Sequence, residues 1–170
     1  FTLSEVNSGT HVGTHMDAPL HFIENGEKMD SISVERFFGR GILLDGRSRS
    51  SFDETLLSGI DLKTGDIVLI ITGWGNRINE EAYFTDYPEI TLGLAERLVA
   101  AGVSIVGTDS ASPDHDPFAT HKKLLGNGIL ILENLTNLDQ LLGASKFSVI
   151  ALPAKYSTEA APARVVAMLS

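Results

Sequence analysis

Residues 11–21 have the sequence HVGTHMDAPLH, which holds three of the chain's five histidines within eleven positions. The same stretch contains one aspartate, Asp17, and one proline, Pro19. Imidazole and carboxylate groups are ligands of divalent transition metals. The crowding of these side chains therefore predicts a metal site, and this stretch organises the interpretation of the whole chain.

A helix would place His11 and His15 on one face, as in the HExxH zinc proteases. The sequence disfavours a helix here, because Gly13 weakens it and Pro19 disfavours helical geometry at Ala18. The position after the first histidine is also valine, so the general-base glutamate of that motif is missing.

An extended chain explains the spacing better, because alternate side chains of a strand point to the same side. His11, His15 and Asp17 would then face one ion, and Gly13 would leave space between them. Two imidazoles and one carboxylate suit Zn²⁺, Mn²⁺ or Fe²⁺ and leave a position open for water. A turn at the following proline would keep His21 nearby. Ordinary hydrogen-bonded histidines are the alternative, and the spacing of the cluster favours metal binding.

The composition limits the kind of protein. The 170 residues fit one compact domain, and 43% of them are hydrophobic. The chain has no cysteine, which excludes disulfides and thiolate metal sites and suits a cytoplasmic location. A net charge of −9 argues against a nucleic-acid partner. Because no apolar run reaches the roughly 18 residues of a membrane span, we expect a soluble protein without a membrane partner.

The start of the chain has neither a methionine nor the basic and apolar regions of a signal peptide. We therefore expect residues 1–170 to form a single domain that lacks a short N-terminal segment. Among the aromatic residues, Trp74 follows a predicted strand, and we expect it in the core rather than lining a pocket. We expect Phe22, Phe37 and Phe38 in the core or at an interface.

Apolar runs rich in β-branched residues predict strands, and they alternate with a few helices along the chain. The clearest helix covers residues 91–101, with Thr91 as its cap and Gly102 as its end. Its expected apolar face is Leu92, Ala95, Leu98 and Val99. This alternation predicts an α/β domain with a partly mixed sheet. The predicted strands are residues 41–45, 66–74, 103–108, 128–133, 147–152 and 164–169.

Two later segments carry further candidate ligands. Residues 109–121 follow a predicted strand, where α/β proteins usually place their sites, and they contain His115 and His121. Glu133 closes the apolar run of residues 129–132. A carboxylate that ends a buried strand is costly unless it is paired or bound to a cation. A solvated glutamate is the alternative for Glu133 taken alone.

These segments together resemble the cyclase-like metal-dependent hydrolase family, which includes bacterial kynurenine formamidase and isatin hydrolase. The resemblance extends along nearly the whole chain. The segments that carry it are HVGTHMDAPLHF at 11–22, TGW at 72–74, GTD at 107–109, HKKLL at 121–125, ILENL at 131–135 and APAR at 161–164.

The resemblance implies a swivelling β/β/α fold with a mixed sheet and a metal site that is often binuclear. It implies that His11, His15 and Asp17 hold one ion and that His121 holds a second. Asp17 and Glu133 would bridge the two ions. The resemblance also implies a homodimer or a larger homo-oligomer, on which the composition is silent.

We expect the activity to be hydrolysis of a small amide, either an N-formyl arylamide such as formylkynurenine or a cyclic amide. A bound Zn²⁺ or Mn²⁺ ion would acidify water to supply the nucleophile. His21 would be the general acid/base that protonates the leaving nitrogen. A role of His21 in orienting Asp17 is the alternative. His115 matches no ligand position of the family, so we expect it at the surface.

Three other functions stay open. A serine hydrolase is disfavoured, because the chain contains no GxSxG motif. A non-catalytic, metal-stabilised binding or assembly domain would keep the ligands and show no turnover. The third alternative is a cyclase or lyase of the same family that acts on another carbonyl substrate.

Overall fold

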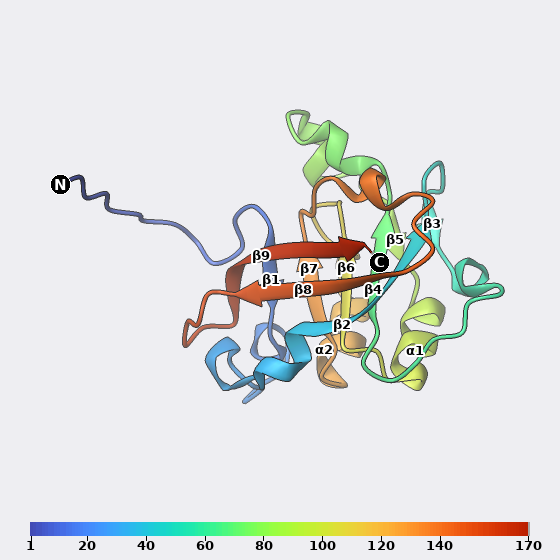
Figure 1. Ribbon diagram of the computed structural model, residues 1–170, viewed down its shortest axis with the longest axis horizontal. Helices are drawn as coiled ribbons and strands as arrows, with labels where there is room; N and C mark the ends of the chain where they lie inside the picture. The colour runs from blue at the N-terminus through green and yellow to red at the C-terminus, as the bar shows by residue number, and fades with distance from the viewer. Residues whose placement is uncertain (170) are drawn as a thin grey trace.

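The computed structural model describes residues 1–169, and its main feature is a seven-stranded mixed sheet that closes into a barrel (Figure 1). The strand order is β1-β7-β6-β4-β2-β8-β9. Two helices, α1 (Leu92–Ala101) and α2 (Ala119–Gly126), pack outside it. The barrel strands are β1 (His15–Asp17), β2 (Phe38–Asp45), β4 (Ile67–Ile71), β6 (Ile105–Thr108), β7 (Leu130–Glu133), β8 (Phe147–Pro153) and β9 (Ala160–Leu169).

The remaining elements are short. A separate two-stranded sheet pairs β3 (Ser51–Phe52) with β5 (Glu89–Ile90). The 3₁₀ helices are η1 (Pro19–His21), η2 (Met29–Ser31), η3 (Val34–Phe37), η4 (Glu54–Leu57), η5 (Trp74–Arg77), η6 (Glu81–Phe84) and η7 (Leu138–Leu141).

The barrel combines a parallel and an antiparallel part. Strands β2, β4, β6 and β7 run parallel, as expected for strands joined by crossover connections. The long β8–β9 pair is antiparallel and crosses in front of the central strands in Figure 1. The short strand β1 is antiparallel to both β7 and β9 and so closes the barrel. The predicted α/β class and mixed sheet are confirmed.

Alternation along β4 shows how the two sides of the sheet are used. Ile67, Leu69 and Ile71 belong to the core inside the barrel, whereas Val68 and Ile70 belong to the core beneath the helices. All five side chains are buried, which is why this segment is a continuous apolar run in the sequence.

The prediction of α1 is confirmed at both ends. The Thr91 hydroxyl accepts a hydrogen bond from the backbone N–H of Leu94, and Gly102 ends the helix with a left-handed φ of 71°. The expected apolar face was wrong at one position, because Leu92 is 45% exposed while Leu94 is fully buried. The apolar face of α1 packs on the barrel, and the side chain of Leu92, in the first turn of the helix, points away from the barrel.

Trp74 is only half-buried and lies outside both cores, so the prediction of a core tryptophan was wrong. Strand β4 ends at Ile71, and Gly73 then turns the chain with a φ of 76°. The Trp74 indole N–H donates to the backbone oxygen of Tyr83, and the Arg77 guanidinium lies 4.2 Å from its ring centroid.

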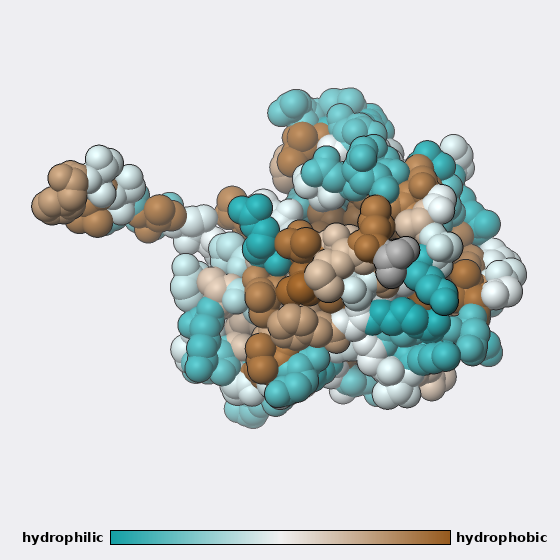
Figure 2. Space-filling model, viewed as in Figure 1, coloured by the Kyte–Doolittle hydropathy of each residue, from teal (hydrophilic) through white to brown (hydrophobic). Residues whose placement is uncertain are grey.

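The three phenylalanines also differ from one another. Phe37 is buried in the barrel core and Phe22 packs partly buried under the helices, but Phe38 is 45% exposed. Phe38 is therefore not a core residue. It belongs to an apolar outer surface over β2, β8 and β9 that also includes Val166 and Met168, and Figure 2 shows part of this surface in brown. Within residues 1–169, no helix has the length and apolar character needed to cross a membrane.

Candidate metal centre

Strand β1 directs the candidate ligands to the outside of the barrel. The Met16 side chain belongs to the barrel core, so its neighbours His15 and Asp17 point to the opposite side, beneath the helices. On β7, Leu132 is likewise inside the barrel, and Glu133 points outward directly opposite His15. The strand register thus places an imidazole and a carboxylate side by side.

The approach to β1 is not extended, so the prediction of a strand over residues 11–17 was wrong for its first half. Residues 11–14 form bends, and Gly13 adopts a left-handed φ of 65°. No atom lies within 4 Å of the place where a Cβ of Gly13 would stand. The glycine is therefore needed for its backbone conformation rather than for space. This bend brings His11 Nδ1 to 3.1 Å from Asp17 Oδ1.

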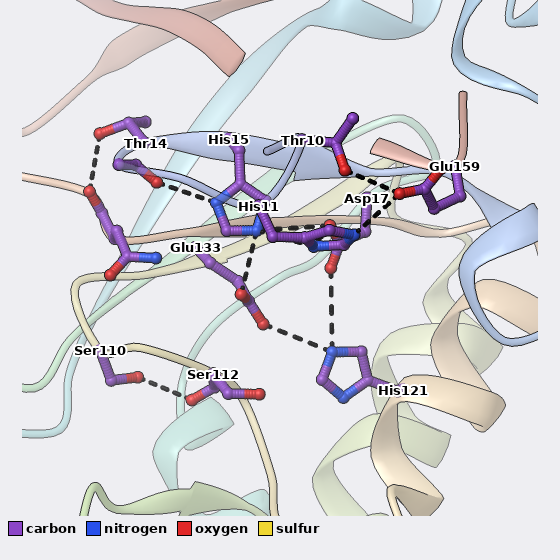
Figure 3. Close-up of polar contacts among 12 residues, drawn as sticks. Thr10, His11, Thr14, His15, Asp17, Ser110, Ser112, His121, Glu133 and Glu159 are labelled. Atoms are coloured by element: carbon purple, nitrogen blue, oxygen red, sulfur yellow. Dashed lines mark hydrogen bonds and ion pairs between the residues drawn. The ribbon is translucent and has the colours of Figure 1, made fainter. Parts of the chain in front are cut away.

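Side chains from three distant segments converge at this point (Figure 3). His15 Nε2 lies 3.1 Å from Glu133 Oε2, and His121 Nε2 from α2 lies 3.4 Å from Glu133 Oε1. His121 Nε2 is also 3.8 Å from Asp17 Oδ2. The structure therefore brings together all five residues that the sequence analysis predicted as ligands.

His21 lies at the edge of the same cluster, on η1. Its ring centroid is 4.3 Å from that of His11 and 5.8 Å from that of His121. One ligand atom each from His11, Asp17 and His21 lie within 4.8 Å of one another, and the same holds for His15, Asp17 and Glu133. The two groups share Asp17, and His21 is close enough to act either on a substrate or on an ion.

The burial of Asp17 gives a test of whether this cluster fits a cation. The side chain is fully buried, and neither carboxylate oxygen makes a hydrogen bond within residues 1–169; the groups that face it are imidazole nitrogens at 3.1 to 3.8 Å. Buried carboxylates are costly unless they are hydrogen-bonded, paired or bound to a metal. Since the surrounding donors are imidazole nitrogens and a second carboxylate, the set fits a divalent cation such as Zn²⁺ or Mn²⁺.

The buried carboxylates and imidazoles of the cluster shift one another's pKa values. The Asp17 carboxylate raises the pKa of His11. Burial lowers the pKa of His15, but Glu133 and Asp17 outweigh it, so the net shift is upward. Burial raises the pKa of Glu133, but hydrogen bonding to His121 and His15 brings it below its usual value. The cluster thus favours bound positive charge.

His21 differs from the other histidines in the direction of its shift. Burial lowers its pKa, and the neighbouring His11 and His121 lower it further, against the attraction of Asp17. A lowered pKa favours the neutral imidazole, which is the form that can accept a proton.

Two residues of the site were missed by the sequence analysis. Asp114 lies under α2 with Oδ1 2.5 Å from His121 Nδ1, and Glu159 Oε1 lies 3.4 Å from His11 Nε2. Asp114 falls inside the segment 109–121 that the sequence had marked, but no motif separates it from its polar neighbours. Glu159 stands in the loop before β9, and no local signal points to it.

His115, expected at the surface, is half-buried. Its ring stacks on Tyr87 with a centroid distance of 4.1 Å, and its Nε2 lies 2.9 Å from the Tyr87 backbone oxygen. Within residues 1–169 it makes no hydrogen bond or ion pair to the candidate ligands, in agreement with its exclusion from the ligand set.

A cavity of about 550 Å³ opens toward the inside of the barrel. Its lining includes Thr14 and the barrel-core residues Leu69 and Val149, whereas the candidate ligands face the helices. This cavity is therefore separate from the space in which a substrate would reach the cluster.

Comparisons with known proteins place the chain in a family. Residues 3–115 match the model of the Cyclase family, described as putative cyclase, and the chain belongs to this family. The kynurenine formamidase of Salinibacter ruber is 33% identical over 172 residues, which covers 96% of this chain and 78% of the relative. The uncharacterized protein MJ0783 of Methanocaldococcus jannaschii is also 33% identical over 172 residues, with 99% and 84% covered.

Solved structures agree with this assignment. An isatin hydrolase bound to the product analogue thioisatinate superposes with a TM-score of 0.85 at 25% identity, covering 95% of this chain and 72% of that one. A potential metal-dependent hydrolase with cyclase activity gives a TM-score of 0.82 at 28% identity, with 95% and 80% covered. The predicted family and the cyclase-like fold are confirmed.

Proposed function

We propose that this chain is a metal-dependent hydrolase that cleaves an amide bond in a small molecule. The observation that carries the proposal is the convergence of three imidazoles and Glu133 around Asp17, whose buried carboxylate has no hydrogen-bond partner within residues 1–169. The similarity to kynurenine formamidases and to an isatin hydrolase supports amide hydrolysis as the reaction class.

The geometry suggests how the ligands divide. His11, His15 and Asp17 surround one position, and His121 approaches from α2 on the other side of Glu133. The first three would hold one ion and His121 would hold a second, and the carboxylates of Asp17 and Glu133 would be available to both. Zn²⁺ and Mn²⁺ both suit these nitrogen and oxygen donors.

A divalent cation in such a site acidifies water and stabilises negative charge on a carbonyl oxygen. The protein must also move a proton from the nucleophile to the leaving nitrogen. His21 is placed for this step, because its imidazole borders His11 and His121 and its lowered pKa keeps it neutral and able to accept a proton. The resulting imidazolium can then donate the proton to the departing amine.

The substrate class follows from the relatives. We propose an N-formyl arylamide, such as formylkynurenine, or a cyclic amide, such as isatin. The rim of the cluster carries aromatic rings that suit a planar substrate: Phe22 lies 4.5 Å from His21 and 5.3 Å from Phe118 between ring centroids.

The test is an assay of the purified protein against a panel of formamides and cyclic amides. The protein is first stripped with a chelator and then reloaded with Zn²⁺ or Mn²⁺. We expect hydrolysis of at least one substrate by the reloaded protein and none by the stripped protein. Unchanged activity after metal removal would falsify the metal-dependent mechanism. Ring closure or elimination without hydrolysis would instead favour a cyclase or lyase.

We further propose that residues 1–170 act as one domain, that the protein works in the cytoplasm, and that it forms a homodimer or a larger homo-oligomer. The exposed apolar surface over β2, β8 and β9 is compatible with self-association. Light scattering coupled to size-exclusion chromatography measures the oligomeric state, and a mass of one chain would contradict the proposal.

A further inference from the structure

Asp114 occupies a buried position between the candidate metal centre and the start of α2. Its side chain is buried, and it makes three contacts with α2. The Tyr87 hydroxyl donates to its backbone oxygen at 3.0 Å, which holds the loop in place. Asp114 itself touches neither Asp17 nor Glu133 within residues 1–169, so it acts through His121.

One carboxylate oxygen of Asp114 anchors the start of the helix. Asp114 Oδ2 accepts the backbone N–H groups of Thr120 at 2.7 Å and of His121 at 3.3 Å. The first N–H groups of a helix have no partner inside it. Phe118, which precedes α2, gives no side-chain cap, so Asp114 supplies the missing acceptor from a distance.

The other oxygen fixes the imidazole. Asp114 Oδ1 lies 2.5 Å from His121 Nδ1, and a carboxylate can only accept a hydrogen bond. His121 Nδ1 must therefore carry a proton. In the neutral ring this leaves the lone pair on Nε2, which faces Glu133 Oε1 at 3.4 Å and Asp17 Oδ2 at 3.8 Å.

We propose that Asp114 is a positioning residue that sets both the orientation and the tautomer of His121, so that Nε2 is presented to the cation. This inference rests on the proposed metal-dependent function. Hydrogen bonding to the second nitrogen of a ligating histidine typically changes metal affinity by about 10- to 100-fold. The Asp114 carboxylate accepts hydrogen bonds both from the backbone of α2 and from the imidazole of His121. One carboxylate therefore fixes both the backbone and the side chain of His121.

The test compares D114N with two control variants by zinc competition against a chromophoric chelator. An asparagine can accept from His121 Nδ1 only if its amide N–H groups face those of Thr120 and His121, so one set of contacts is lost. We expect zinc affinity to fall by about 10- to 100-fold in D114N. D116N removes an exposed charge two residues away and should leave zinc affinity unchanged.

T120A controls for destabilisation of the helix. It removes the hydroxyl that donates to the Ile90 backbone oxygen at 2.7 Å and does not alter the contact between Asp114 and the imidazole. Urea unfolding of the metal-free proteins shows how far each variant is destabilised. We expect T120A to lose stability while its zinc affinity stays within about twofold of wild type, since none of the ligands changes. If T120A loses as much affinity as D114N, the role of Asp114 is structural and the proposal fails.

The proposal can also be tested on the wild-type protein, so that the test does not require every variant to fold. Long-range ¹H–¹⁵N correlation spectra of the zinc-loaded wild type report which nitrogen of His121 is protonated. We expect a proton on Nδ1 and the metal on Nε2. The opposite tautomer overturns the role of Asp114 while leaving the metal site intact, whereas a wild type that binds no zinc overturns the proposed function and this inference together.

Discussion

His15 on β1 lies directly opposite Glu133 on β7, and the two side chains approach to 3.1 Å. The next cross-strand pair, Met16 and Leu132, faces inward and belongs to the barrel core. A slip of one residue in this register would exchange the two faces and bury the imidazole among apolar side chains. The pairing of β1 with β7 therefore specifies the candidate metal centre as much as the identity of the ligands does.

The bend at Gly13 gives a prediction that separates strain from site geometry. G13A places a side chain at a left-handed φ of 65°, which costs about 1–2 kcal/mol of stability. Because the bend turns His11 toward Asp17, we also expect weaker zinc binding, measured by competition with a chelator.

G59A is the matched control for G13A. Gly59 has a φ of 74° and equally open surroundings, but it lies in the loop after η4 and not at the cluster. We expect it to lose similar stability in urea unfolding and to bind zinc as the wild type does. Equal zinc affinity in the two variants would show that the bend is not needed for the site.

Removal of the central carboxylate should abolish stabilisation by metal. A ligand that binds only the folded state at 100 times its Kd adds about 2.7 kcal/mol to the free energy of unfolding. We expect zinc to stabilise the wild type in this way and to leave D17N unchanged, as measured by urea unfolding with and without zinc. D61N, which changes an exposed aspartate, should respond like the wild type. A full zinc response in D17N would remove Asp17 from the ligand set.

His11 and His21, whose ring centroids lie 4.3 Å apart at the edge of the cluster, should differ in what their replacement by alanine does. H21A should retain its metal and lose about 10²- to 10⁴-fold in kcat, because only the proton transfer is removed. H11A should lose both metal and activity, because a ligand is removed. Elemental analysis beside steady-state kinetics measures both quantities. If H21A is purified without metal, His21 is a ligand and the assignment of its role must change.

A buried aspartate that pairs with a half-exposed arginine, remote from the site, gives a prediction about stability and pH. Asp66 accepts hydrogen bonds from Arg40 Nε at 2.9 Å and Nη2 at 2.6 Å, and from the Lys63 backbone at 2.7 Å. Burial raises the pKa of Asp66, but the Arg40 contact outweighs it and the net shift is downward. We expect D66N to lose about 1.5–3 kcal/mol of stability at pH 7 in urea unfolding, since hydrogen bonds to a charged group are lost.

The sign of the pH dependence follows from that downward shift. The Asp66 contribution is fully present above the unfolded pKa of about 3.9 and is lost as the pH falls through the lower folded value. Stability of the wild type should therefore fall more steeply in acid than that of D66N. D45N is the control, because the Asp45–Arg47 pair has similar distances but both side chains are 47% exposed. It should cost less than about 1 kcal/mol.

The sequence predicted the elements of the fold well where local signals are strong. The β4 run is buried on both faces and therefore continuously apolar, and α1 carries both a cap and a glycine end. Closure of the barrel was not predictable in this way. It depends on the three-residue strand β1 pairing with β9, a contact between residues about 145 positions apart that leaves no periodic pattern.

The candidate site shows the same division. The ligands within residues 11–21 were predictable because their types and spacing are distinctive, and the family resemblance supplied His121 and Glu133. The conformation of the motif was not predictable, because the sequence of residues 11–17 does not distinguish a bend at Gly13 from an extended chain. Asp114 could not be singled out because its role arises only when α2 docks and brings His121 Nδ1 to its carboxylate.

The position of β9 has a consequence for the life of the newly made chain. The strand that holds β1 in place from its other side, Ala160–Leu169, is synthesised about 145 residues after the histidine motif. Until that strand arrives, His15 and Asp17 sit on an edge with one neighbour. The barrel around the candidate ligands is thus complete only after residues 160–169 have been translated, and a nascent chain stalled before residue 160 carries the histidine motif without the strand that closes the barrel beside it.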